Sequence, residues 1–246
     1  VYNNNLLDHG GVPLNADGSL RNVRIYGHTY KGKSLYEILE SYVRKGFHAL
    51  DAKERERGKD MMWYIWLSEN SPLFGKDKMA TFERYFLAEK ETHKEKKNPY
   101  YMLLEDEKVI DGILREFGLE TEGTHIVNGH VPVKLKNGEN PIKCGGKVYV
   151  IDGGFSRAYQ KETGIAGYTL IYNSHGIFLS AHRPFESTEA AIEKETDIHS
   201  DDMMVKRAAE RKLVGDTDIG RELKEQIEDL KMLLEAYRSG QIAEKM

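Results

Sequence analysis

The chain has 246 residues, of which 31% are charged and 39% hydrophobic, a composition typical of a soluble globular protein rather than a disordered one. A formal net charge of -4 argues against a general nucleic-acid-binding protein, and no apolar run approaches the roughly 20 residues that a membrane span needs. A single cysteine, Cys144, excludes a disulfide framework within one chain and fits a reducing compartment. We therefore expect a cytoplasmic protein whose partners are neither nucleic acids nor membranes.

The first motif is His9-Gly10-Gly11, which follows a short stretch, Leu6 to Asp8, that predicts the end of a strand. A histidine at a strand end before two glycines has room for a metal ion and a bound phosphate. The alternative is an ordinary turn histidine with no chemical role. The chain begins with Val1 and reaches this motif at residue 9, so we expect it to be a fragment of a longer protein.

Between residues 23 and 67 the patterns predict a hairpin, a helix and a buried strand. Val23 to Tyr30 is typical of a small hairpin that turns at Tyr26-Gly27. Ser34 to Glu37 has the spacing of a capping box and predicts that a helix opens at Ser34. The charged stretch from Asp51 to Asp60 indicates a solvated helix face or a connector. The continuous apolar run from Met61 to Leu67 then predicts a buried strand.

Cationic residues gather in the loop after that run. Ser68 to Lys78 is polar, contains glycine and carries Lys76 and Lys78, which is the composition of a phosphate-binding loop or, alternatively, of a solvated surface loop. Arg84 follows closely and is a further candidate for binding phosphate. The charged stretch from Leu87 to Pro99 is either a mobile surface loop or a place where lysines attract a second phosphate. Those lysines are Lys94, Lys96 and Lys97.

Two predicted strands organise the middle of the chain, and each ends at small residues beside a polar group. Thr124 to Asn128 ends in Gly129-His130, and Lys147 to Ile151 ends in Asp152-Gly153-Gly154. Strand ends of this kind form the binding edge of α/β proteins, because glycine lets a substrate or metal approach the backbone. His130 is therefore either a metal ligand or a loop histidine without a role. A predicted helix over Glu107 to Phe117 precedes the first strand and gives a β-α-β rhythm.

The last third of the chain predicts a hairpin, a polar connector and a long helix. Tyr168 to Asn173 and Ile177 to Ala181 form the hairpin, and Glu186 to Asp202 is weakly patterned. The helix runs from Ile219 to Tyr237, with Thr217 or Asp218 as N-cap. Its apolar stripe packs against the protein or covers a missing part, and left bare it would allow a homo-oligomer. The stripe consists of Ile219, Leu223, Ile227, Leu230, Leu234 and Tyr237.

Six blocks of sequence, in order and at consistent spacing, resemble the class III, Firmicute-type fructose-1,6-bisphosphatases of the calcineurin-like metallophosphoesterase superfamily. The blocks are His9-Gly10-Gly11, Ser71 to Met79, Thr81 to Phe86, Lys97 to Tyr101, Asn128 to Pro132 and Val150 to Ser156. The resemblance covers nearly the whole chain. It implies an α/β (α+β) fold: part of a metallophosphoesterase-type β-sandwich flanked by helices, with a C-terminal helical tail. On this reading residues 1–185 belong to the catalytic domain, and residues 186–246 form a polar connector and the last helix.

The resemblance also implies an activity, a cofactor and site residues. The activity is hydrolysis of D-fructose 1,6-bisphosphate to D-fructose 6-phosphate and phosphate in gluconeogenesis, with Mn²⁺ in a dinuclear centre. His9 and His130 match two metal-ligand positions, and the substrate-binding candidates are Lys76, Lys78, Arg84, Asp152, Gly153 and Gly154. The aspartate and asparagine motifs of the superfamily are absent, so we identify no catalytic residue here and expect the chain alone to be inactive. The alternatives are a non-catalytic domain that binds a phosphorylated ligand or a partner, and an enzyme that acts on phosphoproteins.

Overall fold

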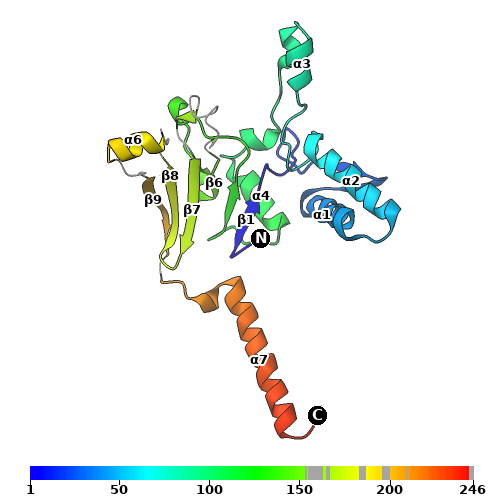
Figure 1. Cartoon of the computed structure of the whole chain (residues 1–246), viewed down its shortest axis with the longest axis vertical. Helices are drawn as coiled ribbons and strands as arrows, with labels where there is room; N and C mark the ends of the chain where they lie inside the picture. The colour runs from blue at the N-terminus through cyan, green and yellow to red at the C-terminus, as the bar shows by residue number, and fades with distance from the viewer. Residues whose placement is uncertain are drawn as a thin grey trace.

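The structure is a computed structural model that describes residues 1–152, 154, 163–164, 167–182, 187–195, 200–208 and 210–243. It has the α+β content that the sequence predicts (Figure 1). The strands are β1 (Asn5–Asp8), β2 (Val23–Ile25), β3 (His28–Tyr30), β4 (His125–Asn128), β5 (Ile142–Lys143), β6 (Val148–Val150), β7 (Gly167–Asn173), β8 (Gly176–His182) and β9 (Ser200–Arg207). The α-helices are α1 (Gly32–His48), α2 (Ala52–Leu67), α3 (Thr81–Phe86), α4 (Glu107–Glu116), α6 (Thr188–Glu193) and α7 (Asp218–Arg238). Short 3-10 turns connect several of them.

A four-stranded sheet in the order β1-β4-β6-β5 forms the centre of the molecule. β1, β4 and β6 are parallel, and β5 is antiparallel to β6. Asp8 pairs with Asn128, and Asn128 pairs with Val150, so the carboxyl ends of the three parallel strands lie side by side. The predicted strands at these positions are therefore confirmed. Helix α4 packs on this sheet through a shared buried cluster that includes Leu6, Ile110, Ile113, Leu114, Ile126 and Val148.

A second, three-stranded antiparallel sheet, β7-β8-β9, lies beside the first (Figure 1). Side chains of the two sheets meet in a buried cluster of Val127, Tyr149 and Ile177, against which Leu170 and Val205 also pack. β9 lies within the region expected to be a polar connector, yet it pairs with β8 from Gly176 to His182, so the sheet continues past residue 185. Most side chains of β9 are exposed, which is why no alternation of apolar and polar residues marked it as a strand.

Helices α1 and α2 form a hairpin that packs on the β2-β3 ribbon around a cluster of its own. The prediction of a strand from Met61 to Leu67 is wrong, because these residues form the second half of α2. Met61 and Ile65, four positions apart, face the cluster, whereas Trp63 and Trp66 are 62% and 56% exposed, as expected for two faces of one helix.

The predicted start of α1 was also displaced. The helix begins at Gly32 rather than Ser34, with Lys31 at the N-cap. The Ser34 hydroxyl lies in the first turn and accepts a hydrogen bond from the Lys31 N–H. The capping-box pattern therefore predicted the helix correctly but placed its start later in the first turn than the structure does.

Helix α7 projects away from both sheets (Figure 1). Thr217 caps it, as predicted, by accepting a hydrogen bond from the Gly220 N–H. The six residues of its apolar stripe are each between 41% and 64% exposed, so the stripe does not pack against the described part of the protein. Among the described residues no helix is long and apolar enough to cross a membrane.

Candidate active site

The structure brings His9 and His130 together. They directly follow β1 and the Asn128-Gly129 end of β4, and because these strands are parallel neighbours the two turns lie side by side. The Gly129 N–H extends the ladder by donating to the His9 carbonyl at 3.0 Å. His9 Nε2 then lies 3.1 Å from His130 Nδ1, although the residues are 121 positions apart in sequence.

The surroundings of His130 fix which of its nitrogens carries the proton. Its Nε2 lies 2.9 Å from the carbonyl oxygen of Phe74, which can only accept a hydrogen bond, so Nε2 is protonated and Nδ1 holds the lone pair. Burial lowers the pKa of His130, which favours this neutral ring. The residue has a φ of 63°, in the left-handed region that few side chains adopt. Metal-binding histidines characteristically donate their other ring N–H to a backbone carbonyl in this way.

The spacing of the two rings suits a shared ion. Two nitrogens bound to one metal at about 2.0–2.1 Å, with angles of about 90–110°, are roughly 3 Å apart, and the observed separation of His9 Nε2 and His130 Nδ1 is 3.1 Å. The described residues nevertheless contain no group of three or more His, Cys, Asp or Glu side chains placed to hold a metal. The histidine pair therefore fits part of a ligand set.

Asp152 lies at the third parallel strand end, beyond β6. Its Oδ1 accepts a hydrogen bond from the Gly154 N–H at 2.7 Å, and its carbonyl accepts one from the Val133 N–H at 2.8 Å. The negative charge of its carboxylate partly opposes the effect of burial on His130, whose pKa nevertheless stays below its ordinary value. Gly154 has a φ of 72°, which favours glycine. Gly153 lies outside the described residues.

Two hollows meet at the histidine pair, and His9, Lys76 and His130 line both. The first, of about 730 Å³, runs along α2 and the loop after it, and also includes Arg84 and Glu95. The second, of about 680 Å³, follows the carboxyl edge of the sheet. Its polar lining includes Lys97, Lys134, Asp152 and Thr163, with the Gly129 and Gly154 backbone between them.

Lys76 and Arg84 lie in the first hollow, where both contact Glu95. Lys76 Nζ is 2.8 Å from Glu95 Oε2, and an Arg84 terminal nitrogen is 3.4 Å from Glu95 Oε1. Burial alone would raise the pKa of Glu95, but these cations and a hydrogen bond from the Ala80 N–H lower it, so it stays ionised. Lys78 lines neither hollow, because its ammonium donates to the Thr92 carbonyl at 2.6 Å. Glu95 was not foreseen from the sequence.

Lys97 supplies positive charge to the second hollow. Burial lowers its pKa, and the charges of Lys134 and Lys76 lower it further, while Glu139 acts in the opposite direction. An anion in this hollow would relieve that repulsion. Lys94, by contrast, forms an ion pair with Glu91 at 2.6 Å. Of the three lysines proposed for a second phosphate, the structure thus places Lys97 in the hollow, and it adds Lys134, which the sequence had not indicated.

Two half-buried tyrosines hold the turn that carries His9, and a buried carboxyl group precedes it. The Tyr36 hydroxyl donates to the Gly11 carbonyl at 3.2 Å, and the Tyr101 hydroxyl donates to the Gly10 carbonyl. Asp8, the last residue of β1, is only 8% exposed, and neither carboxylate oxygen has a hydrogen-bond partner of normal geometry among the described residues. Burial raises the pKa of Asp8 to about 7, since the charged form is poorly solvated there.

A pair of imidazoles between two lysine-lined hollows, at the carboxyl edge of a mainly parallel sheet, defines a site suited to anions such as phosphate esters. The family model described as Firmicute fructose-1,6-bisphosphatase matches residues 1–239, and the chain belongs to this family.

Curated relatives agree over the whole chain. It is 58% identical over 243 residues to "Fructose-1,6-bisphosphatase class 3" of Clostridioides difficile (strain 630), covering 98% of this chain. It is 56% identical over 247 residues to "Fructose-1,6-bisphosphatase class 3" of Alkaliphilus metalliredigens (strain QYMF), covering 99% of this chain. The chain spans 37% of the length of both relatives. No solved structure matches it.

Proposed function

We propose that these residues form part of a metal-dependent fructose-1,6-bisphosphatase, which hydrolyses D-fructose 1,6-bisphosphate to D-fructose 6-phosphate and phosphate in cytoplasmic gluconeogenesis. Family membership and the names of the relatives support the substrate. The observation that carries the proposal is the convergence of His9 Nε2 and His130 Nδ1 at 3.1 Å. We take residues 1–185 as part of the catalytic domain and residues 186–246 as the connector and last helix.

The proposed cofactor is a pair of Mn²⁺ ions, and His9 and His130 are the residues of this chain that would hold metal. When bound, such ions neutralise phosphate charge and supply a hydroxide nucleophile. The Phe74 carbonyl keeps the His130 Nδ1 lone pair available, and the tyrosine hydroxyls hold the His9 turn in place. We propose that carboxylate ligands come from the part of the relatives that this chain does not span, because two neutral imidazoles cannot compensate the charge of two divalent ions.

The two hollows suggest how a bisphosphate would lie. Lys76 lines both hollows beside the histidine pair, so it is placed to contact the phosphate that is cleaved. Lys97 and Lys134 line the second hollow and are candidates for the other phosphate. Asp152 and Gly154 line the second hollow as well, and with Gly153 they are candidates for contact with the sugar. Lys76 and Arg84 are both paired with Glu95, so each would contact a phosphate only if its ion pair opened.

A second candidate function is a non-catalytic domain that binds a phosphorylated ligand. The presence of only two clustered metal ligands among the described residues favours it. The two candidates differ in one observable result, which is whether bound phosphate ester is hydrolysed once a complete ligand set is supplied.

The metal site can be tested on the chain itself by nuclear magnetic resonance. Mn²⁺ is paramagnetic and broadens the signals of nearby rings even when it binds weakly. We expect substoichiometric Mn²⁺ to broaden the ring signals of His9 and His130 before those of His48 and His93, which lie on other elements. The variant His9→Ala should protect His130 from broadening, whereas His48→Ala should not. Equal broadening of all histidines would refute the metal assignment.

The activity can be tested in a chimaera in which these 246 residues replace the matching part of a curated relative. We expect Mn²⁺-dependent release of phosphate from fructose 1,6-bisphosphate, with His9→Ala and His130→Ala each lowering kcat at least about a hundredfold and His48→Ala leaving it unchanged. Binding of the bisphosphate without hydrolysis would favour the non-catalytic candidate. Faster release from a phosphopeptide than from the sugar would favour a phosphoprotein phosphatase.

A further inference from the structure

A second cation-rich pocket lies at the opposite end of the sheet from the histidine pair. It opens where β1 and β4 begin, at Asn5 and His125, whereas His9 and His130 follow the ends of the same strands. At about 3.3 Å per residue the two places are roughly 15 Å apart along the strands. The pocket measures about 80 Å³, roughly a tenth of either hollow at the histidine pair, so its occupant must be small.

A chain of hydrogen bonds, buried at His125 and partly exposed at its two ends, holds Lys206 at this pocket. His125 is 5% exposed, and its Nδ1 lies 2.9 Å from Asn5 Oδ1. The Asn5 amide nitrogen donates to the carbonyls of Tyr2 and Asn3, so Oδ1 is an acceptor and His125 Nδ1 carries the proton. His125 Nε2 therefore holds a lone pair, which accepts a hydrogen bond from Lys206 Nζ at 3.1 Å.

The ammonium groups of Lys206 and Lys212 are not neutralised by the carboxylates around them. Within the described ranges neither lysine forms an ion pair, and Lys206 Nζ has no hydrogen-bond partner other than His125. Burial lowers the pKa of Lys206, and the like charge of Lys212 lowers it further. Both lysines line the pocket, so an anion bound there could contact both and would remove this repulsion.

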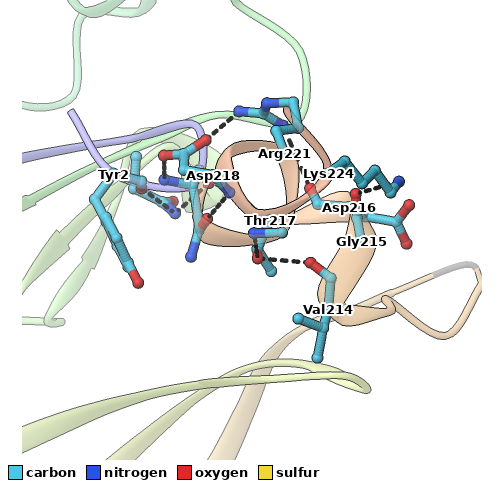
Figure 2. A network of polar contacts seen from close by, with 11 residues as sticks. Tyr2, Val214, Gly215, Asp216, Thr217, Asp218, Arg221 and Lys224 are labelled. Carbon is cyan, nitrogen blue, oxygen red and sulfur yellow. Dashed lines mark hydrogen bonds and ion pairs between the residues drawn. The ribbon is translucent and has the colours of Figure 1, made fainter. Parts of the chain in front are cut away.

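The acidic residues of the pocket are already engaged elsewhere. Figure 2 shows Asp218 between Arg221 and the turn that contains Tyr2, and Asp218 also accepts the Asn3 N–H at 2.6 Å. Asp216 accepts the Leu213 N–H at 2.8 Å. The lining thus carries three cationic side chains against two carboxylates, and only Arg221 among the cations is paired with one of them.

We propose that this pocket binds a small phosphate-type oxyanion through Lys206 and Lys212, at a place separate from the site that contains His9 and His130. Two lysines suit a doubly charged oxyanion, because each ammonium can donate a charge-assisted hydrogen bond to a different oxygen. The buried His125 positions Lys206 but stays neutral, so it contributes orientation rather than charge.

The probe is inorganic phosphate, added to the whole chain in the presence of a chelator so that no metal bridges phosphate to His9 and His130. The readout is the chemical shift of the His125 ring. Bound phosphate should accept a hydrogen bond from Lys206 Nζ and thereby weaken the hydrogen bond from Lys206 to His125, which changes this shift. We expect a saturable shift with phosphate, and no saturable shift with sodium chloride at the same ionic strength.

Substitutions locate the response. Lys212→Gln should weaken phosphate binding about tenfold or more, and Lys212→Arg should keep it within about threefold, since loss of one charge-assisted hydrogen bond is a change of this size. Lys206→Gln should weaken binding as well. The matched control is Lys59→Gln on the exposed face of α2, which should have no effect.

Lys212 decides the outcome even if Lys206→Gln disturbs the fold, because the Lys212 side chain has no partner among the residues described. Unchanged affinity in Lys212→Gln would overturn the proposal. So would a response to chloride equal to that of phosphate, or a shift confined to the signals of His9 and His130, which would place the binding at the other site.

Discussion

Replacing Gly58 by alanine should push helices α1 and α2 apart. A Cβ at Gly58 would lie 2.3 Å from the Gly46 nitrogen, 2.4 Å from Gly46 Cα and 2.6 Å from the Tyr42 carbonyl oxygen. All three are backbone atoms of α1, so no side-chain rotation can make room. Ordinary van der Waals contact starts near 3.4 Å, so the two helices must separate by about 1 Å.

The magnitude follows from two opposing effects. Overpacking of this kind costs about 1–3 kcal/mol, while alanine in place of glycine inside a helix returns up to about 1 kcal/mol. We therefore expect Gly58→Ala to lower the free energy of unfolding by about 1–2 kcal/mol, which is roughly 2–8 °C in Tm for a chain of this size.

The matched control is Gly112→Ala on α4, where an added Cβ meets no atom within 4 Å. Gly112 is exposed in the middle of a helix, so alanine there should raise Tm slightly. The assay is thermal and urea unfolding followed by circular dichroism. If Gly58→Ala were as stable as Gly112→Ala, the close contact between α1 and α2 would be refuted.

Two further predictions concern the pocket lined by Lys206 and Lys212 and its surroundings. Burial, and then the charge of Lys206, lowers the pKa of His125 to about 4, so stability should be complete above the unfolded value of 6.5 and fall as pH drops toward 4. Urea unfolding should show that the free energy of unfolding falls by about 2 kcal/mol between pH 7.5 and pH 5. His125→Gln should flatten this part of the pH profile. An equally steep profile in the variant would contradict the reasoning. Asp218→Ala should remove the acceptor of the Asn3 N–H and weaken the attachment of the base of α7, where the N–H of residue 218 still donates to Asn3 Oδ1. Trypsin should therefore cut α7 faster than in wild type. Glu225→Ala, on the same helix, should leave the rate of cutting unchanged, and equal rates in both variants would show that the Asp218 contacts do not anchor the helix.

The sequence predicted elements whose apolar residues either recur with a clear period or form short runs between turn residues. Helix α4 and the strands β4 and β6 were found because their buried residues recur with a clear period or form short apolar runs between turns. Met61 to Leu67 was misassigned because an unbroken apolar run has no period that separates a strand from a helix. β9 was missed because its exposed side chains carry no alternation.

The candidate site likewise contains residues that the sequence could predict and residues that it could not. His9, His130 and Asp152 were predictable because each follows a strand, and parallel strands bring their ends to one edge. The Phe74 carbonyl and Glu95 were not, since a backbone oxygen has no sequence signature and Glu95 reaches Lys76 only through the path of a loop. The pocket lined by Lys206 and Lys212 also includes Asn5 and His125, and no local sequence pattern connects residues so far apart in the chain.

The pairing of β1 with β4 also constrains the order of folding. Asn5 must meet His125 before the β1-β4 ladder can form, and closing a loop of that length costs entropy before any contact across the ladder offsets it. The same pairing sets the positions of His9 and His130. A partly folded chain that has formed only its local elements, α4 or the α1-α2 hairpin, would hold two isolated histidines. The histidine pair should therefore assemble late, and its appearance in a refolding experiment would report formation of the central sheet.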